Sequence, residues 1–223
     1  MSCCTPASPR LLWHVTLRGA GRVHPFPKER DRFAFLARLR GVLAGGRAGC
    51  EGFCVMPEEA RLILAAPAAE SLRGFLETAC RAYSRYWHEW YPPRLRVFGA
   101  VSAAGVPEAL RWDVLAALEH EPVRAGLCRD AWQYRWSSAA AHSALGPSYL
   151  PLALEEWRQA WTHARWRERL AGVACDLRAL KEADTLLGRA RPLRALAAQG
   201  REAAPPPLFQ DGAEAARAAG AGF

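Results

Sequence analysis

The segment Cys50–Ala66, with the sequence CEGFCVMPEEARLILAA, contains two short apolar runs separated by Pro57-Glu58-Glu59. Apolar runs of this length on either side of a short connection are typical of paired β-strands. The segment therefore predicts an antiparallel hairpin within a larger sheet, with strands over Cys50–Met56 and Arg61–Ala66.

The flanking segments supply further strands and helices. Leu11–Arg18, LLWHVTLR, places Trp13, Val15 and Leu17 on one face and polar residues on the other, the period of two expected for a half-buried strand. A fourth strand is expected over Leu95–Ser102. Apolar residues at helical spacing predict helices over Glu29–Leu43, Ser71–Trp90 and Pro107–His120. This order predicts an α+β fold, a ferredoxin-like antiparallel sheet with packed helices.

The chain beyond residue 150 differs in composition from the part before it. Tryptophans and arginines at helical spacing predict an amphipathic helix over Trp157–Trp166, and a second helix is expected around Cys175–Leu187. These helices either pack on the preceding domain or present a surface to a partner. Beyond Gly200 the sequence is rich in proline, alanine and glycine, which predicts disorder. The expected organisation is a domain over 11–145, a helical extension over 150–198 and a disordered tail over 199–223.

The composition favours some partners and locations over others. The chain has 223 residues, 51% of them hydrophobic, and its 30 Lys and Arg residues against 22 Asp and Glu residues give a formal net charge of +8. This balance favours acidic partners such as nucleic acid. No segment approaches the roughly 20 apolar residues of a membrane span, and residues 1–10 lack the apolar core of a signal peptide, so we expect a cytoplasmic protein without a membrane partner. The 7 cysteines are scattered, which argues against a disulfide framework and a zinc ribbon.

Short motifs follow one another along residues 11–142. They are His14-Val15-Thr16 followed by Arg18-Gly19, the helix segment Phe33–Leu39, Cys54-Val55-Met56-Pro57, Glu121–Leu127 (EPVRAGL) and Tyr134–Ser138 (YRWSS). In this order they resemble the HVTxRG, hairpin, NPVRAGL and YxWSS motifs of the REP-associated tyrosine transposases (RAYT), which are single-tyrosine members of the HUH endonuclease class.

The resemblance implies a small α+β domain that acts on single-stranded DNA near hairpins. In the family, two histidines on one strand bind a divalent metal such as Mg²⁺ or Mn²⁺, and a tyrosine on a later helix attacks the scissile phosphate. The matching positions here are Glu59, Arg61 and Ala117, and Glu121 stands where the family has asparagine. A guanidinium has no lone pair for a metal ion, and alanine carries no nucleophile. The resemblance therefore implies degenerate catalytic motifs without a metal or other cofactor, and we expect Glu59 and Arg61 to form an ion pair at the surface.

DNA binding is the activity that these substitutions leave open. Arginines on the long helix, at its end and around the first turn predict a basic surface, and the candidate DNA-binding residues are Arg18, Arg22, Arg81, Arg85, Arg94, Arg96 and Arg124. Aromatic residues interleaved with them are candidates for base stacking, namely Tyr83, Tyr86, Trp87 and Tyr91. The spacing of Tyr83, Tyr86, Trp87 and Trp90 favours packing against the sheet instead.

The predicted function is thus binding of single-stranded or hairpin DNA by a catalytically degenerate transposase-like protein. One alternative is an active DNA-nicking transposase with a rebuilt site, in which Tyr83 or Tyr86 supplies the nucleophile near His88. The other is a protein-interaction module on the same fold, in which the sheet surface and the C-terminal helices bind a partner.

Overall fold

The hairpin predicted within Cys50–Ala66 forms two neighbouring strands of a five-stranded sheet. The computed structural model describes residues 11–92, 95–172 and 191–192. The strand order is β2-β3-β1-β4-β5, and each pair of neighbouring strands is antiparallel. The strands span Leu11–Gly19 (β1), Gly49–Val55 (β2), Glu59–Ala66 (β3), Phe98–Gly105 (β4) and Arg191–Pro192 (β5).

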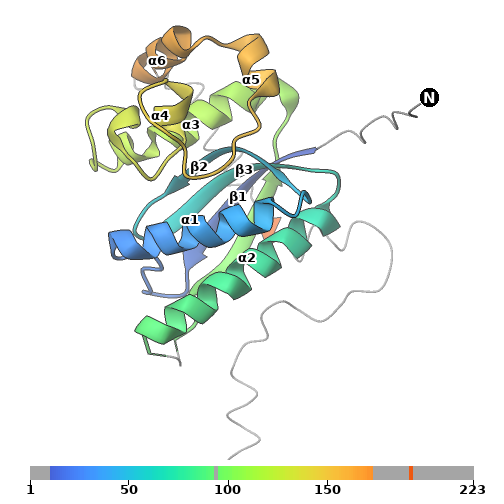
Figure 1. The fold of residues 1–223 in the computed structure, drawn as a ribbon, viewed down its shortest axis with the longest axis vertical. Helices are drawn as coiled ribbons and strands as arrows, with labels where there is room; N and C mark the ends of the chain where they lie inside the picture. Colours follow the sequence, from blue (N-terminus) through green and yellow to red (C-terminus); the bar gives the residue numbers. More distant parts are fainter. Residues whose placement is uncertain (1–10, 93–94, 173–190, 193–223) are drawn as a thin grey trace, which may run out of the picture.

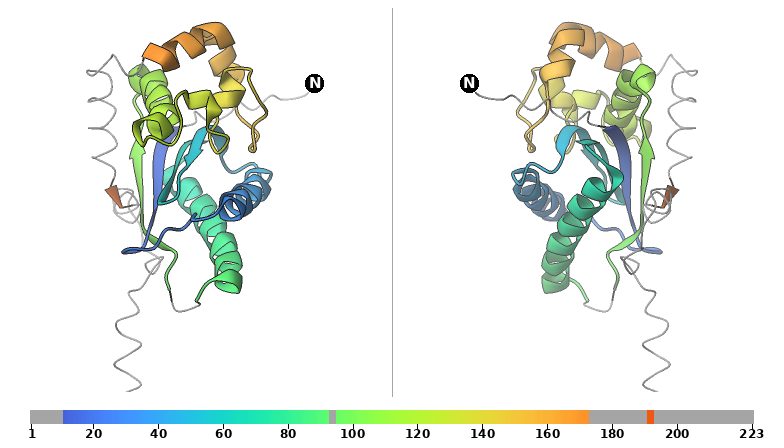
Figure 2. Two further views of the ribbon diagram at one scale, coloured as in Figure 1. Left: turned by 90° about the vertical axis from the view of Figure 1, so that its left-hand side faces the viewer. Right: turned by 90° about the vertical axis from the view of Figure 1, so that its right-hand side faces the viewer.

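Helices cover both faces of the sheet, which lies between two helical layers (Figure 1, Figure 2). One layer consists of α1 (Glu29–Leu43) and α2 (Ala69–Trp90). The other consists of α3 (Arg111–Arg124) with the shorter helices α4 (Ala139–His142), α5 (Glu155–Ala160) and α6 (His163–Gly172). The fold is therefore α+β, an antiparallel sheet with packed helices, which confirms the fold class predicted from the sequence.

The alternation within β1 determines which side chains face α1 and α2. Trp13, Val15 and Leu17 belong to the same buried cluster as the apolar residues of these two helices. The rings of Phe26, Phe35, Tyr83 and Phe98 pack together there, with centroids 4.9 to 6.3 Å apart. Burial of each large apolar side chain contributes roughly 1.5–3 kcal/mol, so this cluster holds both helices on the sheet.

A second cluster joins α3 to the opposite face of the sheet. It contains Cys54 and Ile63 from the hairpin and Val114 and Leu115 from α3. A Cβ atom on Gly52 would lie 2.3 Å from the Cδ1 atom of Leu115. The glycine therefore allows the helix to approach the sheet more closely than any larger residue would.

The EPVRAGL motif forms the C-terminal end of α3. The N–H of Leu127 donates to the carbonyl of Pro122 at 2.8 Å, and the N–H of Gly126 donates to the carbonyl of Val123 at 3.0 Å. Gly126 has a φ of 69°, a left-handed conformation that glycine adopts without strain. This pattern is a Schellman cap.

The helix predicted over Pro107–His120 therefore begins and ends later than expected. A 3-10 turn, η1 (Glu108–Leu110), precedes it, and the helix continues through Pro122 to Arg124. A second 3-10 turn, η2 (Ala131–Gln133), precedes the YxWSS segment. The cap at Gly126 ends the helix, whereas the prediction ended it before the proline.

The fourth strand is also displaced from its predicted range, Leu95–Ser102, to Phe98–Gly105. The N–H of Leu95 donates to the carbonyl of Pro92 and not to a neighbouring strand, and β4 starts after this residue. At the other end, β1 supplies a partner for each small residue up to Gly105, which lies opposite Trp13. Pairing with a central strand thus extends β4 over residues of low intrinsic strand preference.

The amphipathic helix predicted over Trp157–Trp166 is wrong as a single element, because α5 and α6 divide it. Trp161 has an extended backbone, and the Oγ1 atom of Thr162 accepts a hydrogen bond from the N–H of Arg165 at 3.3 Å. This side chain caps the first turn of α6 and starts a new helix. The break allows both Trp157 and Trp166 to join the buried cluster with α3.

Two predictions lie outside the described residues, the helix around Cys175–Leu187 and the disordered tail over 199–223. In the part of the chain that the structure describes, no helix has the length and apolar character needed to cross a membrane. Cys50, Cys54 and Cys80 are buried, in keeping with small apolar residues, and burial raises the pKa of each thiol.

Candidate functional site

Charged side chains form a continuous network where the ends of β1 and β3 meet the end of α3. The Nη2 atom of Arg18 and the Nε atom of Arg61 each lie 2.6 Å from a different carboxylate oxygen of Glu59. The Nη1 atom of Arg61 also contacts Oε1 of Glu121 at 2.7 Å, and this oxygen lies 3.1 Å from Nη1 of Arg124. Positive and negative groups therefore alternate, and each carboxylate is held between arginines.

The strand register brings this network together. Glu59 and Arg61 are two residues apart on β3, so their side chains share one face of the sheet. In the pairing of β1 with β3, Arg18 lies directly opposite Glu59. Opposite charges at facing positions of neighbouring strands attract each other, and Glu121 adds a carboxylate from the last turn of α3.

Glu59 and Arg61 pair as predicted, but they do not form a surface ion pair. Glu59 is only 5% exposed, because it lies beneath its arginine partners and the end of α3. Burial opposes ionisation of this carboxyl, but the charge of Arg61 and the hydrogen bonds from Arg18 and Arg61 outweigh it and lower the pKa of Glu59. Glu59 is therefore ionised at neutral pH and forms a fixed part of the network.

The residues of the network do not fit a divalent metal of the kind that the REP-associated tyrosine transposases bind. Both carboxylate oxygens of Glu59 already accept hydrogen bonds from arginine. Arg61 offers no lone pair, and its charge repels a cation. Among the described residues, no group of three or more His, Cys, Asp and Glu side chains is arranged to hold a metal ion.

Ala117, the position that the sequence resemblance matched to a tyrosine, lies one turn before Glu121 on α3. It is buried in the apolar cluster that also contains Cys54, Met56 and Ile63. The neighbouring His120 is buried, and burial, together with the charge of Arg124, lowers its pKa. The surroundings of Ala117 are therefore apolar, and the nearby histidine is neutral at pH 7.

A cleft of about 320 Å³ opens beside the network. It is lined by Arg18, Met56, Pro57, Glu58, Glu59, Ala125 and Leu127. These residues come from the end of β1, the β2–β3 turn and the cap of α3. Because Arg18 is paired with Glu59, and Glu58 adds a further carboxylate, the cleft has no excess of positive charge to attract a phosphate.

The sheet and its helices match those of a solved transposase. That structure is a REP-associated tyrosine transposase bound to a REP hairpin, and the superposition has a TM-score of 0.52. It covers 66% of this chain and 89% of that chain at 12% sequence identity, so the likeness is one of fold. No protein-family model matches the chain, and neither does any curated protein. The chain therefore has a transposase-like fold.

The structure separates the arginines that the sequence grouped as one basic surface. Arg18 and Arg124 belong to the charged network beside the cleft. Arg81 and Arg85 are exposed on α2, which covers the opposite face of the sheet. These two pairs therefore lie on different sides of the molecule.

Arg22 and Arg96 lie between those two groups, at the end of the sheet where β1 finishes and β4 begins. Both are exposed, and the segments that carry them are joined by a hydrogen bond from the N–H of Ala20 to the carbonyl of Val97 at 3.1 Å. Arg94 is outside the described residues. Exposed arginines thus continue around this end of the sheet.

The aromatic residues of α2 mostly pack against the protein, as their spacing favoured. Tyr83 donates to the carbonyl of Pro25 at 2.7 Å, and Tyr86 donates to the carboxylate of Asp31 at 2.9 Å. Burial raises the pKa of both phenols. For Tyr86, burial and the hydrogen bond to Asp31 together raise the pKa to about 12. Neither phenol is suited to act as a rebuilt nucleophile. Trp90, which the sequence grouped with the packed residues, is instead 56% exposed.

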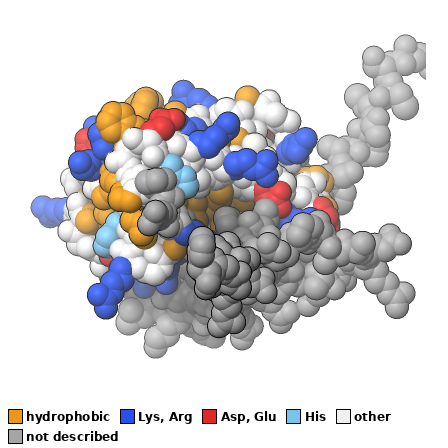
Figure 3. All heavy atoms as spheres, turned by 90° about the horizontal axis from the view of Figure 1, so that it is seen from below, with side chains coloured by type: hydrophobic (Ala, Val, Ile, Leu, Met, Phe, Trp, Pro, Cys, Tyr) orange, Lys and Arg blue, Asp and Glu red, His pale blue; other side chains and the backbone are white. Residues whose placement is uncertain are grey.

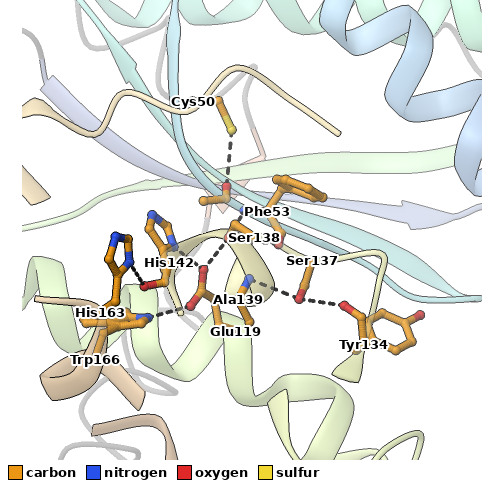
Figure 4. A network of polar contacts seen from close by, with 11 residues as sticks. Cys50, Phe53, Glu119, Tyr134, Ser137, Ser138, Ala139, His142, His163 and Trp166 are labelled. Carbon is orange, nitrogen blue, oxygen red and sulfur yellow. Dashed lines mark hydrogen bonds and ion pairs between the residues drawn. The ribbon is translucent and has the colours of Figure 1, made fainter. Parts of the chain in front are cut away.

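A buried polar cluster joins α3, α4 and α6 (Figure 4). One oxygen of Glu119 accepts hydrogen bonds from Ser138 and His142, and the other accepts one from the indole N–H of Trp166 at 2.9 Å. Catalytic triads use the same residue types, but there the histidine lies between the acid and the serine. Here the acid lies between them and all are buried, so the cluster holds the helices together.

The burial of His14 on β1 predicts a stability that decreases in acid. Its side chain is 1% exposed, and neither ring nitrogen has a hydrogen-bond partner among the residues that the structure describes. Burial, with a contribution from the charge of Arg61, lowers its pKa from 6.5 to about 3. Between these values the unfolded chain binds a proton that the folded protein excludes, so the free energy of unfolding falls by about 1.4 kcal/mol per pH unit as pH decreases.

We expect His14 to account for a loss of about 2 kcal/mol between pH 6.5 and pH 5 in denaturant titrations. The variant His14→Leu should lack this part of the pH dependence. The exposed His24 serves as a control, since His24→Ala should retain it. The same pH slope in the wild type and in His14→Leu would contradict the prediction.

Proposed function

We propose that this protein is a catalytically degenerate transposase-like protein of the REP-associated tyrosine transposase type, and that it binds single-stranded or hairpin DNA without cutting it. The observation that carries the proposal is the network of Glu59, Arg61 and Glu121. In this network, the positions that match the family's metal ligands are occupied by an ion pair, and a second carboxylate holds the arginine in place.

Loss of the nucleophile supports the absence of cleavage independently. Ala117 is surrounded by apolar side chains, and the phenols considered as substitutes, Tyr83 and Tyr86, are bonded to other groups and have raised pKa values. A rebuilt active site would need a different nucleophile and a different way to stabilise charge on the phosphate. The ion pair at the metal-ligand positions and the missing nucleophile therefore both argue against the enzyme alternative.

Charge and fold support a role in DNA binding. The chain carries a net charge of +8, supplied almost wholly by arginine, which makes bidentate contacts with phosphate. The solved transposase of the same fold is described as bound to a REP hairpin. Because the cleft beside Glu59 is electrostatically balanced, exposed arginines outside it are the better candidates for contacts with the DNA backbone.

The proposal can be tested with a labelled DNA hairpin that carries a single-stranded flank. Anisotropy titrations at several salt concentrations should give an affinity that decreases steeply with salt, because phosphate contacts release counterions. A matched blunt duplex should compete weakly, and DNA recovered after incubation with Mn²⁺ should be intact. Nicked DNA would overturn the proposed loss of catalysis. Absence of binding at low salt would overturn the DNA-binding role and favour the protein-interaction alternative.

A further inference from the structure

The C-terminal end of α2 presents a tryptophan to solvent on a rigid support. The ring of Trp87 stacks on that of Tyr91 with centroids 3.9 Å apart and an interplanar angle of 19°. Tyr86 and Tyr91 both donate hydrogen bonds to the buried carboxylate of Asp31, at 2.9 and 2.7 Å. These contacts fix the last turn of the helix against α1, so the position of Trp90 is defined although its side chain is exposed.

The side chain of Arg30 lies over the ring of Trp90. The guanidinium carbon of Arg30 lies 4.3 Å from the ring centroid, a cation–π contact between α1 and α2. Trp90 is nevertheless 56% exposed, and the nearby Leu95 is 45% exposed. The pair thus presents an aromatic surface to solvent with a positive charge beside it.

The surroundings of Trp90 are apolar at the centre and mostly basic at the edge. Seen from below, hydrophobic side chains gather at this end of the molecule, with Lys and Arg side chains around them (Figure 3). The exposed basic residues of the segments that meet here are Arg22, Lys28, Arg30, Arg85 and Arg96. The acidic residues are the exposed Glu29 and Glu89 and the buried Asp31, whose Oδ1 atom lies 3.7 Å from Nε of Arg30. The balance is positive, which suits a polyanion better than a protein surface of mixed charge.

We infer that Trp90 and Arg30 form a stacking site for an unpaired nucleotide of single-stranded DNA. A base inside a duplex is stacked on both faces, whereas an unpaired base has a free face that can lie on the exposed indole. Proteins that bind single strands combine such aromatic platforms with arginines that contact the phosphates. The inference rests on the proposed DNA binding and identifies the part of the surface that holds the unpaired segment.

This site lies at the same end of the sheet as the charged network. The turn after β1 connects the two, because the N–H of Gly19 donates to the carbonyl of Glu58 beside the cleft and Tyr83 of α2 donates to the carbonyl of Pro25. Arg22 lies on this turn, which contacts the β2–β3 turn beside the cleft and also contacts α2. A hairpin and its single-stranded flank can thus contact the protein along one end of the sheet.

The test compares Trp90→Ala and Trp90→Phe with the wild-type protein, using the hairpin with a single-stranded flank. We expect Trp90→Ala to weaken binding about tenfold or more, and Trp90→Phe to retain most of the affinity, because phenylalanine still stacks. Phe33→Ala is the matched control, since Phe33 is also 56% exposed but its ring packs edge-on against Tyr149, with centroids 6.3 Å apart, and not at the end of α2. Thermal unfolding of each variant checks that the fold is unchanged.

A second measurement isolates stacking from other effects. Abasic sites in the flank should weaken binding to the wild type but cause no further loss in Trp90→Ala. If the wild type binds DNA and Trp90→Ala binds equally well, the stacking site is wrong while the proposed function stands. If the wild type binds no DNA, both fail. If Trp90→Ala instead converts a dimer to a monomer in sedimentation, the patch is an interface between copies of the chain, and the inference is overturned.

Discussion

Replacement of Glu119 by alanine is expected to lower the free energy of unfolding by about 3–5 kcal/mol, measured by denaturant titration at pH 7. The carboxyl group is fully buried and accepts hydrogen bonds from Ser138, His142 and Trp166. Alanine would leave the donors of His142 and Trp166 buried without this partner, and it would also create a cavity. The loss should therefore exceed that of an ordinary core truncation.

Two further variants show whether this loss comes from the polar cluster. Glu119→Gln keeps the size of the side chain and one acceptor oxygen, so it should be destabilised by less than Glu119→Ala. Glu168→Ala, on the exposed side of α6, should change stability by no more than about 0.5 kcal/mol. A loss below about 1 kcal/mol for Glu119→Ala would mean that α4 and α6 do not depend on the cluster.

Replacement of Gly19 by alanine is expected to cost about 3 kcal/mol, which is large for the addition of one methyl group. Gly19 ends the first-strand motif, and a Cβ atom on it would lie 1.8 Å from the carbonyl oxygen of Val23 and 2.8 Å from Cδ of Pro25. The turn cannot simply move away. Its backbone is hydrogen-bonded through Ala20 to Val97, the residue before β4, and through Phe26 to Pro57 in the β2–β3 turn.

The same substitution at a different glycine, Gly41, should raise the free energy of unfolding instead of lowering it. Gly41 lies in the last turns of α1, and a Cβ atom there would meet no atom of the described part of the chain within 4 Å. Alanine is preferred over glycine inside a helix, so Gly41→Ala should raise the free energy of unfolding by about 0.5–1 kcal/mol. Equal effects of Gly19→Ala and Gly41→Ala in denaturant titrations would contradict the close contact at Gly19.

The sequence predicted the elements of the sheet best where a local period was strong. The alternation in Leu11–Arg18 and the hairpin within Cys50–Ala66 were confirmed as β1, β2 and β3. The prediction was less accurate for β4 and for the tryptophan-rich segment. At β4 the partner strand extends pairing over small residues, and after α5 a single threonine cap starts a new helix. Such local contacts outweigh the average preference of a segment.

In the candidate site, too, some contacts could be predicted from the sequence and others could not. The pairing of Glu59 with Arg61 follows from their spacing on one strand, and it was predicted. The other partners were not, since Arg18 is 41 residues from Glu59 and Glu121 is 60 residues from Arg61. The exposure of Trp90 was also missed, because its helical spacing is the same as that of the buried aromatic residues of α2.

Periodicity, turn residues and motifs along the chain thus specify most of the elements, the fold class and the spacing that pairs Glu59 with Arg61. The folded structure alone decides that Glu59, Arg61 and Glu121 form a buried network, that the predicted arginines lie on different sides of the sheet, and that Trp90 faces solvent beside Arg30. The physical reason is that a period of two or 3.6 residues selects which face of an element is buried. Contacts between distant residues depend on strand register and on where each helix packs, and no local pattern encodes either.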